Sequence, residues 1–394
     1  MRPVSATDRR RAPSAAAVML RAVLEHGPTA RSTVARTTGL SPAAVTRQFT
    51  VLADLGLITE VSDGVAYSGV GRPHVPVDID VDKHVVLGIH IAHDFCTLAA
   101  LDLRGRVQVS TQLPHRHTDP ERTLSAAADG LAALRAPGRI PLGLGVATGG
   151  WVDPDAGVLV EHASLGWSDV PVRALLAART GLPVRVDSHA RALAGAEQLF
   201  GTTRGESVVH LFIGNVVDAA IVTGGEPHRG PRSGAGDVAH LPLGDPEVEC
   251  LCGRRACLEA TVSDRAWAAR AVDAGLIDRP SIMDLVSAAV AGVPAAQTSL
   301  AQRARMVGRA AATLFDIVNP DVLVVTDCGA IMLPEYLATV RAEVGRWSRV
   351  CADPGRDVLA SSFDADSVLA VAAGAALLNE VYADPLSLSD MAFH

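Results

Sequence analysis

Three cysteines and one histidine are the residues whose types and spacing most clearly suggest chemistry. Cys250, Cys252 and Cys257 lie within eight positions, although the chain of 394 residues holds only six cysteines. His240 precedes the first of them by ten residues. Three thiolates and one imidazole complete the tetrahedral ligand set of a structural zinc ion, whereas one disulfide would leave an odd thiol. The sequence therefore predicts structural zinc. The alternative, three buried thiols in a turn, is disfavoured by the polar residues around Gly253.

Composition limits the class of protein. Hydrophobic residues make up 48% of the chain and charged residues 20%, which is enough for two or three domain-sized cores. No apolar run reaches the roughly 18 residues that a membrane span needs, and residues 1–14 lack the apolar segment of a secretory signal. A thiolate site suits a reducing compartment. We therefore expect a cytoplasmic protein without membrane contact.

Charge divides the chain into a basic start and an acidic remainder. Residues 1–50 contain eight arginines and two acidic residues, a net charge of +6. The net charge of the whole chain is −8, so residues 51–394 carry −14. Such a distribution is typical of a protein that binds a polyanion through its N-terminal part alone.

The basic segment has the apolar spacing of short helices. The pattern predicts one helix over residues 15–26 and a second over about 31–38, which ends at Gly39. Ser41 is expected to cap a third helix that begins at Pro42. Helix, short helix, glycine turn and capped helix is the order of a helix-turn-helix domain.

Two short strands are expected to follow as a wing, within residues 55–61 and 65–67. The prediction is therefore a winged helix-turn-helix domain over residues 1–68 that binds double-stranded DNA. Residues 69–82 are expected to be a linker. Its Gly-Arg-Pro segment would lay Arg72 along a minor groove; a flexible linker without DNA contact is the simpler interpretation.

The third helix presents small and polar side chains opposite its apolar residues. Small residues allow close approach to a groove, and an arginine can donate a bidentate pair to guanine or hold a phosphate. The alternatives are a solvated face and a protein-docking surface. The residues predicted to contact DNA from this helix and its cap are Ser41, Ala43, Thr46, Arg47 and Thr50.

The rest of the chain alternates buried strands with alanine-rich helices in two similar series. The first series opens with three strands between residues 85 and 113, and the second opens with a strand over 208–213. Two β-β-β-α-β units around a cleft explain this double series. We predict an α/β body with a first lobe over 83–200 and a second lobe over 201–394. The second lobe would contain the zinc loop, and the C-terminal helix would return to the first.

Two segments resemble those of a known family. Residues 234–240, Gly-Ala-Gly-Asp-Val-Ala-His, are similar to the G-E-x-G-H signature of the ROK family (repressors, open reading frames and kinases). The loop over 250–259 is similar to the family's zinc loop. The resemblance covers nearly the whole chain and implies the two-lobed, actin-like fold of sugar kinases, which is ribonuclease H-like. It also implies one of two activities: ATP-dependent sugar phosphorylation or sugar-responsive control of transcription.

The segments that correspond to the ATP site of the family's kinases are altered here. The first phosphate loop, D-x-G-x-T in the kinases, corresponds to His-Ile-Ala-His-Asp at residues 90–94. The second, G-T-G-x-G-x-G, corresponds to residues 214–220 and keeps only its first glycine. Side chains there block close backbone approach, and Asp218 would repel phosphate. The catalytic aspartate corresponds to His189. We therefore expect no ATP and no kinase activity.

The resemblance also implies a sugar pocket that is only partly retained. Carboxylates and an imidazole can accept hydrogen bonds from sugar hydroxyls. The ligand could be a hexose, a modified sugar or a sugar phosphate; without a ligand, the same side chains would be polar residues satisfied inside the lobe. The residues that correspond to the family's ligand contacts are Ser164, Ser188, His189, Asp237, His240 and Glu259.

Some histidine and tryptophan residues could bind a metal or a ligand, but they are isolated in the sequence, and we expect structural roles for them. Histidines without a partner at metal-ligand spacing, His162 among them, are expected at the surface or in loops. Trp151 is expected to pack rather than to contact a ligand. Neither residue is therefore assigned to a site.

The sequence as a whole predicts a DNA-binding transcriptional regulator, by family default a repressor, that acts as a homodimer or as a tetramer. Two heads would bind two half-sites, and a sugar-type effector between the lobes would shift DNA affinity. Two alternatives remain. One is a sugar kinase with an appended DNA-binding head, and the other is a regulator whose pocket has decayed and binds no ligand.

Overall fold

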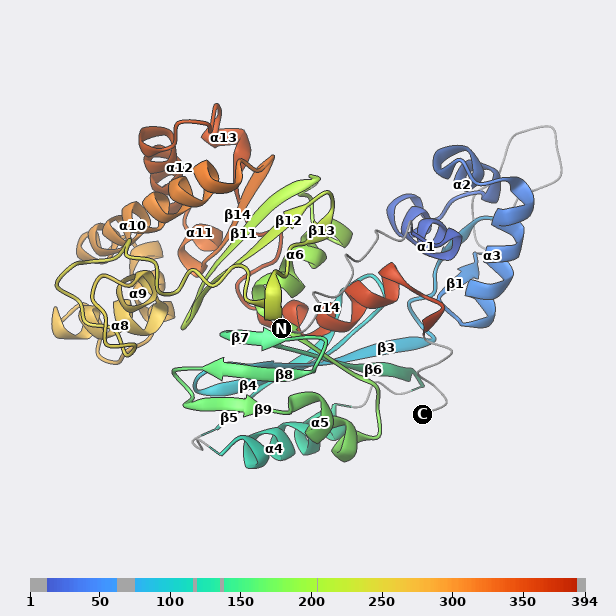
Figure 1. The fold of residues 1–394 in the computed structure, drawn as a ribbon, viewed down its shortest axis with the longest axis horizontal. Helices are drawn as coiled ribbons and strands as arrows, with labels where there is room; N and C mark the ends of the chain where they lie inside the picture. Colours follow the sequence, from blue (N-terminus) through green and yellow to red (C-terminus); the bar gives the residue numbers. More distant parts are fainter. Residues whose placement is uncertain (1–12, 62–74, 116–118, 135–137, 204, 388–394) are drawn as a thin grey trace, which may run out of the picture.

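The computed structural model describes residues 13–61, 75–115, 119–134, 138–203 and 205–387. They form a small N-terminal head and a body of two lobes, each built on a five-stranded sheet (Figure 1). The predicted second wing strand, at 65–67, and Arg72 lie outside these residues. Within the described ranges, no helix combines the length and the apolar character that crossing a bilayer requires.

Three helices make up most of the head, and local signals set their ends. Ser14 caps the first helix, because its Oγ accepts from the N–H of Ala17 at 3.1 Å. Gly39 ends the second with a φ of 72°, which the absence of a Cβ permits. Ser41 caps the third and accepts from the N–H of Ala44 at 3.2 Å. The helices are α1 (Ala15–His26), α2 (Arg31–Thr38) and α3 (Pro42–Asp54).

A two-stranded antiparallel sheet completes the head. Strand β1 (Ile58–Glu60) pairs with strand β2 (Val77–Ile79). The second strand lies within residues 69–82, so the prediction of a linker throughout this segment is wrong. Val77 and Ile79 are buried on either side of one half-buried residue, and this alternation has the period of a strand.

The two lobes repeat one sheet topology, as the double series of strands predicts. The order is β10-β6-β3-β4-β5 in the first lobe and β15-β14-β11-β12-β13 in the second. Each sheet has its first strand in the centre, antiparallel strands on one side and parallel strands on the other. The first sheet consists of β3 (His84–Ile91), β4 (Phe95–Leu101), β5 (Val107–Pro114), β6 (Ile140–Thr148) and β10 (Val184–Ser188). The second consists of β11 (Ser207–Ile213), β12 (Val217–Thr223), β13 (Glu226–Pro227), β14 (Val322–Thr326) and β15 (Val358–Ala360).

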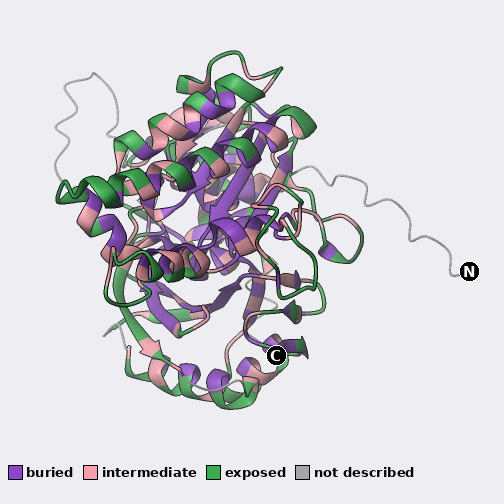
Figure 2. Cartoon of the chain, turned by 90° about the vertical axis from the view of Figure 1, so that its left-hand side faces the viewer, coloured by how far each residue is buried: buried purple, intermediate pink, exposed green. Residues whose placement is uncertain are grey.

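Helices and one small sheet cover these strands, so the central strands are buried, whereas the edge strand β5 and the outer helix faces are largely exposed (Figure 2). The small antiparallel sheet consists of β7 (Trp151–Asp153), β8 (Val158–His162) and β9 (Trp167–Val170). The helices of the first lobe are α4 (Pro120–Ala133), α5 (Val172–Thr180) and α6 (His189–Leu199). Those of the second are η1 (Pro231–Ser233, a 3-10 turn), α7 (Leu258–Val262), α8 (Asp264–Asp273), α9 (Ile282–Val290), α10 (Pro294–Val318), α11 (Cys328–Met332), α12 (Pro334–Trp347) and α13 (Pro354–Asp357).

The last helix, α14 (Val368–Ala383), joins three parts of the molecule (Figure 1). Its N-terminal half shares an apolar cluster with α6 and with strands β11, β12 and β14 of the second lobe. It also lies directly on the first sheet, where a Cβ at Gly88 or Gly145 would collide with Ala373. Its last turns share a core with the head; these residues are Leu377, Leu378, Val381 and Tyr382.

Candidate metal centre and interlobe cavity

The four predicted metal ligands come together at one point of the second lobe. The ligand atoms of His240 and the three cysteines all lie within 4.8 Å of one another. Cys252 Sγ and Cys257 Sγ are 3.6 Å apart, and so are Cys250 Sγ and His240 Nδ1. A tetrahedral ion with bonds of about 2.0–2.3 Å to nitrogen and sulfur needs ligand separations of about 3.5–3.8 Å. The cluster therefore could hold a metal ion of the size of zinc.

Backbone hydrogen bonds hold the cysteines in a tight loop. The N–H of Cys250 donates to the carbonyl of Arg254 at 2.8 Å, and the N–H of Gly253 donates to the carbonyl of Cys250 at 2.9 Å. Gly253, with a φ of 79°, makes the turn between the ligands. A hydrogen bond from the Arg254 side chain lowers the pKa of the exposed Cys252 thiol to about 6. At Cys252 the loop therefore favours the thiolate, which is the form that binds metal, whereas burial raises the pKa of the Cys257 thiol to about 12.

His240 also faces two carboxyl groups of the second lobe. Burial raises the pKa of Asp237 and of Glu259, and the charge of His240 opposes both shifts. Glu259 Oε2 accepts from the N–H of Val217 at 3.1 Å. A metal on Nδ1 of His240 would fix its ring beside these carboxyl groups.

A small cavity lies between the lobes. Its volume of about 20 Å³ leaves room for about one water molecule and not for a sugar. A larger ligand can enter only after part of the wall moves. The lining residues are Gly150, Trp151, Ser188 and Arg191 of the first lobe and Asp218, Ala219, Ser233, Gly234, Ala235, Gly236 and Asp237 of the second.

The segment 229–237 of the second lobe is fastened across this cavity to the first lobe. Trp151 Nε1 donates to the carbonyl of Arg232 at 2.7 Å, and the guanidinium of Arg232 lies 4.4 Å from the centroid of the indole. The buried Arg191 donates to the carbonyl of Ser233 at 3.3 Å. Arg232 and Ser233 both have a φ of 57°, a left-handed conformation that strains residues with a Cβ. Trp151 therefore does more than pack: it holds a strained segment closed.

Buried histidines of both lobes lie near this cavity. His90 Nε2 is 3.2 Å from His189 Nδ1, and the two rings stack with centroids 5.5 Å apart. His189 Nε2 is 3.1 Å from Asp218 Oδ2, and its ring lies 3.8 Å from that of Phe212. Burial lowers the pKa of His189 to about 3 and raises that of Asp218 to about 7. Burial also lowers the pKa of His90. The imidazoles are therefore neutral at neutral pH.

His162 and His210 complete this histidine cluster. His162 was expected at the surface or in a loop, but it is 2% exposed, and its Nδ1 lies 3.3 Å from Ser164 Oγ. His210 Nε2 lies 2.8 Å from Thr326 Oγ1. Burial lowers the pKa of His162 to about 4 and that of His210 to about 3. Because the four histidines come from different strands and a helix start, no local spacing reveals the cluster.

The structure distributes the predicted ligand residues over three places. Ser188 and Asp237 line the cavity. His240 and Glu259 lie at the metal cluster beside Asp237. His189, 1% exposed, is stacked inside the histidine cluster, and Ser164 lies against His162. The cavity wall adds residues that the sequence did not suggest as ligand contacts; these are Trp151, Arg191 and Ser233.

The residues predicted to contact DNA from α3 form one exposed face. They follow the helical spacing i, i+3, i+4, i+7, and they are Ala43, Thr46, Arg47 and Thr50. Ser41, at the N-cap, is exposed beside them. Arg47 forms no ion pair or hydrogen bond within the described part of the chain, so its guanidinium is free to bind a partner.

Besides the apolar core that the head shares with α14, polar contacts also hold the head on the body. Arg104, after β4, donates to the carbonyl of Leu24 at 3.1 Å and pairs with Asp78 of β2. Tyr382 Oη donates to the carbonyl of Leu103 at 2.6 Å, and the carbonyl of Tyr382 accepts from Arg21 Nε at 3.4 Å. The orientation of the head therefore depends on the position of α14.

Comparison with known proteins shows which family the chain belongs to. Residues 86–380 match the ROK family. A transcriptional regulator of Mycobacterium tuberculosis is 36% identical over 390 residues, which are 95% of this chain and 87% of that protein. A xylose repressor of Caldicellulosiruptor bescii is 24% identical over 350 residues, 84% of this chain and 87% of that protein. The chain belongs to the ROK family, as its signature and cysteine loop predict.

Solved structures confirm the predicted class of fold. A ROK family transcriptional regulator described as a homologue of the Escherichia coli Mlc protein has a TM-score of 0.75 at 23% identity, over 95% of this chain and 98% of that chain. A ROK family glucokinase of Streptomyces griseus, in complex with glucose and AMPPNP, has a TM-score of 0.66 at 23% identity, over 73% of this chain and 98% of that chain. The mixed α/β fold is that of ROK sugar kinases, and the named relatives support transcriptional regulation as the function.

Proposed function

We propose that this chain is a DNA-binding transcriptional repressor without kinase activity, which acts as a homodimer or as a tetramer. The observation that carries the proposal is the exposed face of α3, with Arg47 unpaired on it, in an N-terminal segment of net positive charge. Two heads would bind two half-sites, because one head offers too few base contacts for tight binding. With DNA as its partner, the protein would act in the cytoplasm.

The third helix of the head is the element that would enter the major groove. Ala43, near its start, permits close approach of the backbone to DNA. Arg47, one turn further on, has the length and the fork of donors to bind guanine. Thr46 and Thr50 donate their hydroxyl protons to backbone carbonyls at 3.0 and 3.2 Å, so their oxygens remain acceptors for base amino groups or water. Arg72 would contact the minor groove.

The metal of this proposal is zinc in a structural role. Three thiolates and an imidazole fill all four tetrahedral positions and leave none for water. The ion would lock the loop over 250–259 and hold His240 beside Asp237 and Glu259. We therefore expect zinc to determine the shape of the cleft and not to take part in catalysis.

Packing in the cleft argues against a kinase. Phe212 fills the space next to His189, and Val216 lies so close to Gly149 that a Cβ there would collide with it. Val216 belongs to the segment that corresponds to the second phosphate loop of the family's kinases, and Phe212 lies two residues before that segment. Asp218 adds a carboxyl group where phosphates would be held. ATP would have to displace well-packed side chains and approach an acid.

An effector of sugar type would bind between the lobes, at the cavity. Asp218 and Asp237 line it and can accept hydrogen bonds from hydroxyl groups. Arg191 is already used, because its Nε bonds Asp187 at 2.7 Å and its other nitrogens bond two backbone carbonyls. A neutral polyhydroxyl ligand therefore suits this wall better than a sugar phosphate does.

The effect of such a ligand on DNA would pass through α14. Release of segment 229–237 would change the closure of the lobes, and α14 packs against both lobes and against the head. A ligand that binds one closure state better than the other shifts the population of that state, and with it the position of the heads. Repression relieved by the ligand is the expected sign.

Fluorescence anisotropy with DNA from upstream of the protein's own gene, at near-physiological salt and with competitor DNA, tests the proposal. Arg47→Ala should weaken specific binding by roughly 5- to 150-fold. Arg122→Ala, which removes an exposed arginine of the first lobe, is the matched control and should bind as the wild type does. Weak, salt-sensitive binding that is equal in all three proteins, on every fragment of a genomic selection, would overturn the proposal. Candidate sugars can then be titrated into the same complex.

A further inference from the structure

His84 joins the head to the body at the end of α3. It is the first residue of β3, the central strand of the first sheet, and it is 7% exposed. Its Nε2 lies 2.8 Å from the carbonyl oxygen of Leu55, which directly follows α3, and its Nδ1 lies 3.3 Å from that of Ile140, where β6 begins. The shorter contact has the length of a normal hydrogen bond, so the tautomer with the proton on Nε2 is assigned, and this N–H donates to Leu55.

The carbonyl of Leu55 depends on this donor. The last carbonyls of a helix have no partner within the helix itself. One carbonyl near the end of α3 is paired locally, because the N–H of Leu57 turns back and donates to Leu52 at 2.9 Å. Within the described part of the chain, the Leu55 carbonyl accepts only from His84. Loss of the imidazole would leave this partly buried carbonyl unpaired, which is costly.

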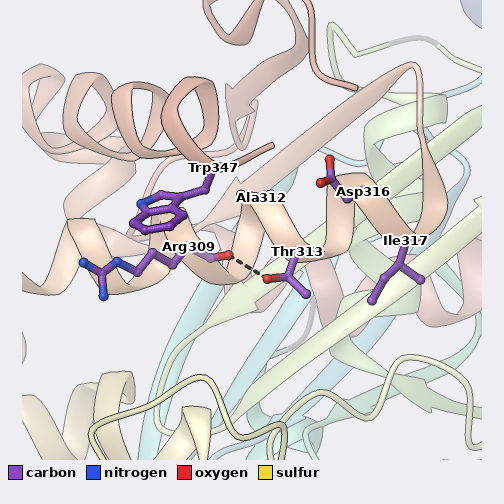
Figure 3. A pocket seen from close by; sticks show the side chains of 6 residues that line it. All are labelled: Arg309, Ala312, Thr313, Asp316, Ile317 and Trp347. Carbon is purple, nitrogen blue, oxygen red and sulfur yellow. Dashed lines mark hydrogen bonds between the residues drawn. The ribbon is translucent and has the colours of Figure 1, made fainter. Parts of the chain in front are cut away.

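The bond differs from side-chain bonds that stay within one helix. In the groove between α10 and α12, Thr313 donates to the carbonyl of Arg309 of the same helix at 3.0 Å (Figure 3). Thr46 of α3 likewise donates to the carbonyl of Pro42 at 3.0 Å. Bonds of that kind move with their helix. The bond from His84 spans 29 positions, so it fixes the end of α3 relative to the first sheet.

Lys83 contacts the same turn. Gly56 has a φ of 70°, and a Cβ at this position would collide with the side chain of Lys83. The absence of a Cβ therefore permits both the backbone conformation and the contact. The polar contacts of Arg104 and Tyr382 hold α1 and β2. The start of β3 is thus placed to hold α3 itself.

We propose that His84 is a positioning residue for DNA recognition, which holds α3 at a fixed angle to the body so that two heads meet two half-sites together. The inference rests on the proposed function, because it concerns how a dimer presents its heads to DNA. Two linked heads gain affinity from the high effective concentration of the second head, and this gain falls when the heads lose their orientation. One head on one half-site has no such gain. Loss of the bond should therefore weaken binding to two half-sites and not to one.

Fluorescence anisotropy of the zinc-loaded full chain tests this role, with the selected operator and with the same DNA in which one half-site is scrambled. His84→Leu should weaken binding to the intact operator by about 10-fold and change binding to the scrambled DNA by less than about twofold. His84→Gln can donate from its amide nitrogen and should stay within about threefold of the wild type on both DNAs. His115→Leu is the matched control, because it removes an imidazole that lies 3.0 Å from the carbonyl of Ala92 elsewhere in the first lobe. It should bind both DNAs as the wild type does.

The outcomes separate this inference from the proposed function. If the wild type binds no DNA specifically, the proposed function fails, and the inference fails with it. If the wild type binds specifically but His84→Leu binds the operator equally well, or loses equal affinity on both DNAs, only the positioning role is overturned. The same conclusion follows if His84→Gln behaves as His84→Leu does, because the donor would then not be what matters.

Amide hydrogen exchange without DNA gives a second readout. Peptides over residues 51–60, which include the end of α3 and β1, should exchange about 10-fold faster in His84→Leu than in the wild type. Peptides of α1 should keep the wild-type rate, because α1 remains packed against α14. Unchanged exchange over 51–60 would overturn the inference. Faster exchange throughout the head would also overturn it, because His84 would then support the fold of the head and not its orientation.

Discussion

His189, at the start of α6, and Asp218, on β12, face each other across the two lobes, with Nε2 3.1 Å from Oδ2. Both side chains are buried, so this interlobe contact is titratable but shielded from solvent. Burial moves the two pKa values in opposite directions, down for the imidazole and up for the carboxyl group. The contact between the lobes therefore includes a buried titratable pair with other buried histidines around it.

The stability that the buried histidines contribute should be lost as the pH drops from about 6.5 to about 4. Folding depresses the pKa of His162, His189 and His210 to about 4, 3 and 3, so in this range the unfolded chain binds protons that the folded chain does not. Carboxyl groups whose pKa is raised by burial act in the opposite direction. These are Asp218, raised to about 7, Asp264, raised to about 6, and Asp237 and Glu259. The contribution of the histidines is therefore measured by removing one imidazole.

Urea unfolding between pH 5 and pH 7 checks this dependence. His210→Gln should flatten the slope of the unfolding free energy by up to about 1.4 kcal/mol per pH unit, because one imidazole no longer titrates. His228→Gln, at an exposed position, is the control and should leave the slope unchanged. Metal release at low pH affects all three proteins alike. Equal slopes for wild type and His210→Gln would refute the role of the cluster.

Cys252→Ser should abolish tight metal binding. The substitution removes one of four ligands, and a three-ligand site loses the closed geometry of a structural centre. Wild type should carry about one zinc ion per chain, and chelation should lower its melting temperature. Cys351→Ser, outside the cluster, should retain the metal and the melting temperature. Equal zinc content in the two variants, measured by elemental analysis, would contradict the ligand assignment.

Trp151→Phe should loosen segment 229–237 without removing the aromatic ring. The change deletes the Nε1 donor to the carbonyl of Arg232, worth about 1 kcal/mol, so amide exchange in the segment should rise about fivefold. Trp267→Phe is matched, because it deletes an indole donor to Ser299 at 3.0 Å elsewhere in the second lobe. If exchange in the segment is the same in both variants, the indole does not hold it closed.

Leu378→Ala should loosen the head. Leu378 is fully buried in the core that α14 shares with α1, and its truncation should cost about 2–5 kcal/mol. Leu193→Ala makes an equivalent cavity in the cluster between α6 and α14 and should leave the head protected. Limited proteolysis of α1 reports the difference. Equal cleavage in the two variants would show that the head is not held by this core.

Local signals account for the features that the sequence predicts well. The ends of α1 to α3 follow from caps and glycine turns only a few residues away, and three of the metal ligands lie in a single loop. The repeated sheet is visible because each buried strand has its own apolar run. In all these cases, the residues that determine the structure are neighbours along the chain.

Contacts between distant segments account for what the sequence did not predict. Trp151 meets Arg232 across 81 positions, and His90 meets His189 across 99. Strand β2 pairs with β1, although the two are far apart in the sequence. It has only two buried residues and follows a glycine-rich segment, so its apolar pattern is too short to be recognised as a strand. His189 was expected to contact a ligand, but its surroundings are set by three other strands. Such neighbourhoods exist only once the lobes have assembled.

The shared core of α1 and α14 bears on how such a regulator can be altered. A body that began at residue 83 would lack β2 and would expose the apolar side chains of Leu378 and Val381 to water. Domain transplantation between regulators would therefore have to carry β2 and the last turns of α14 along with the helices of the head. The head and the last turns of α14 would therefore have to be exchanged together, although they lie at opposite ends of the sequence.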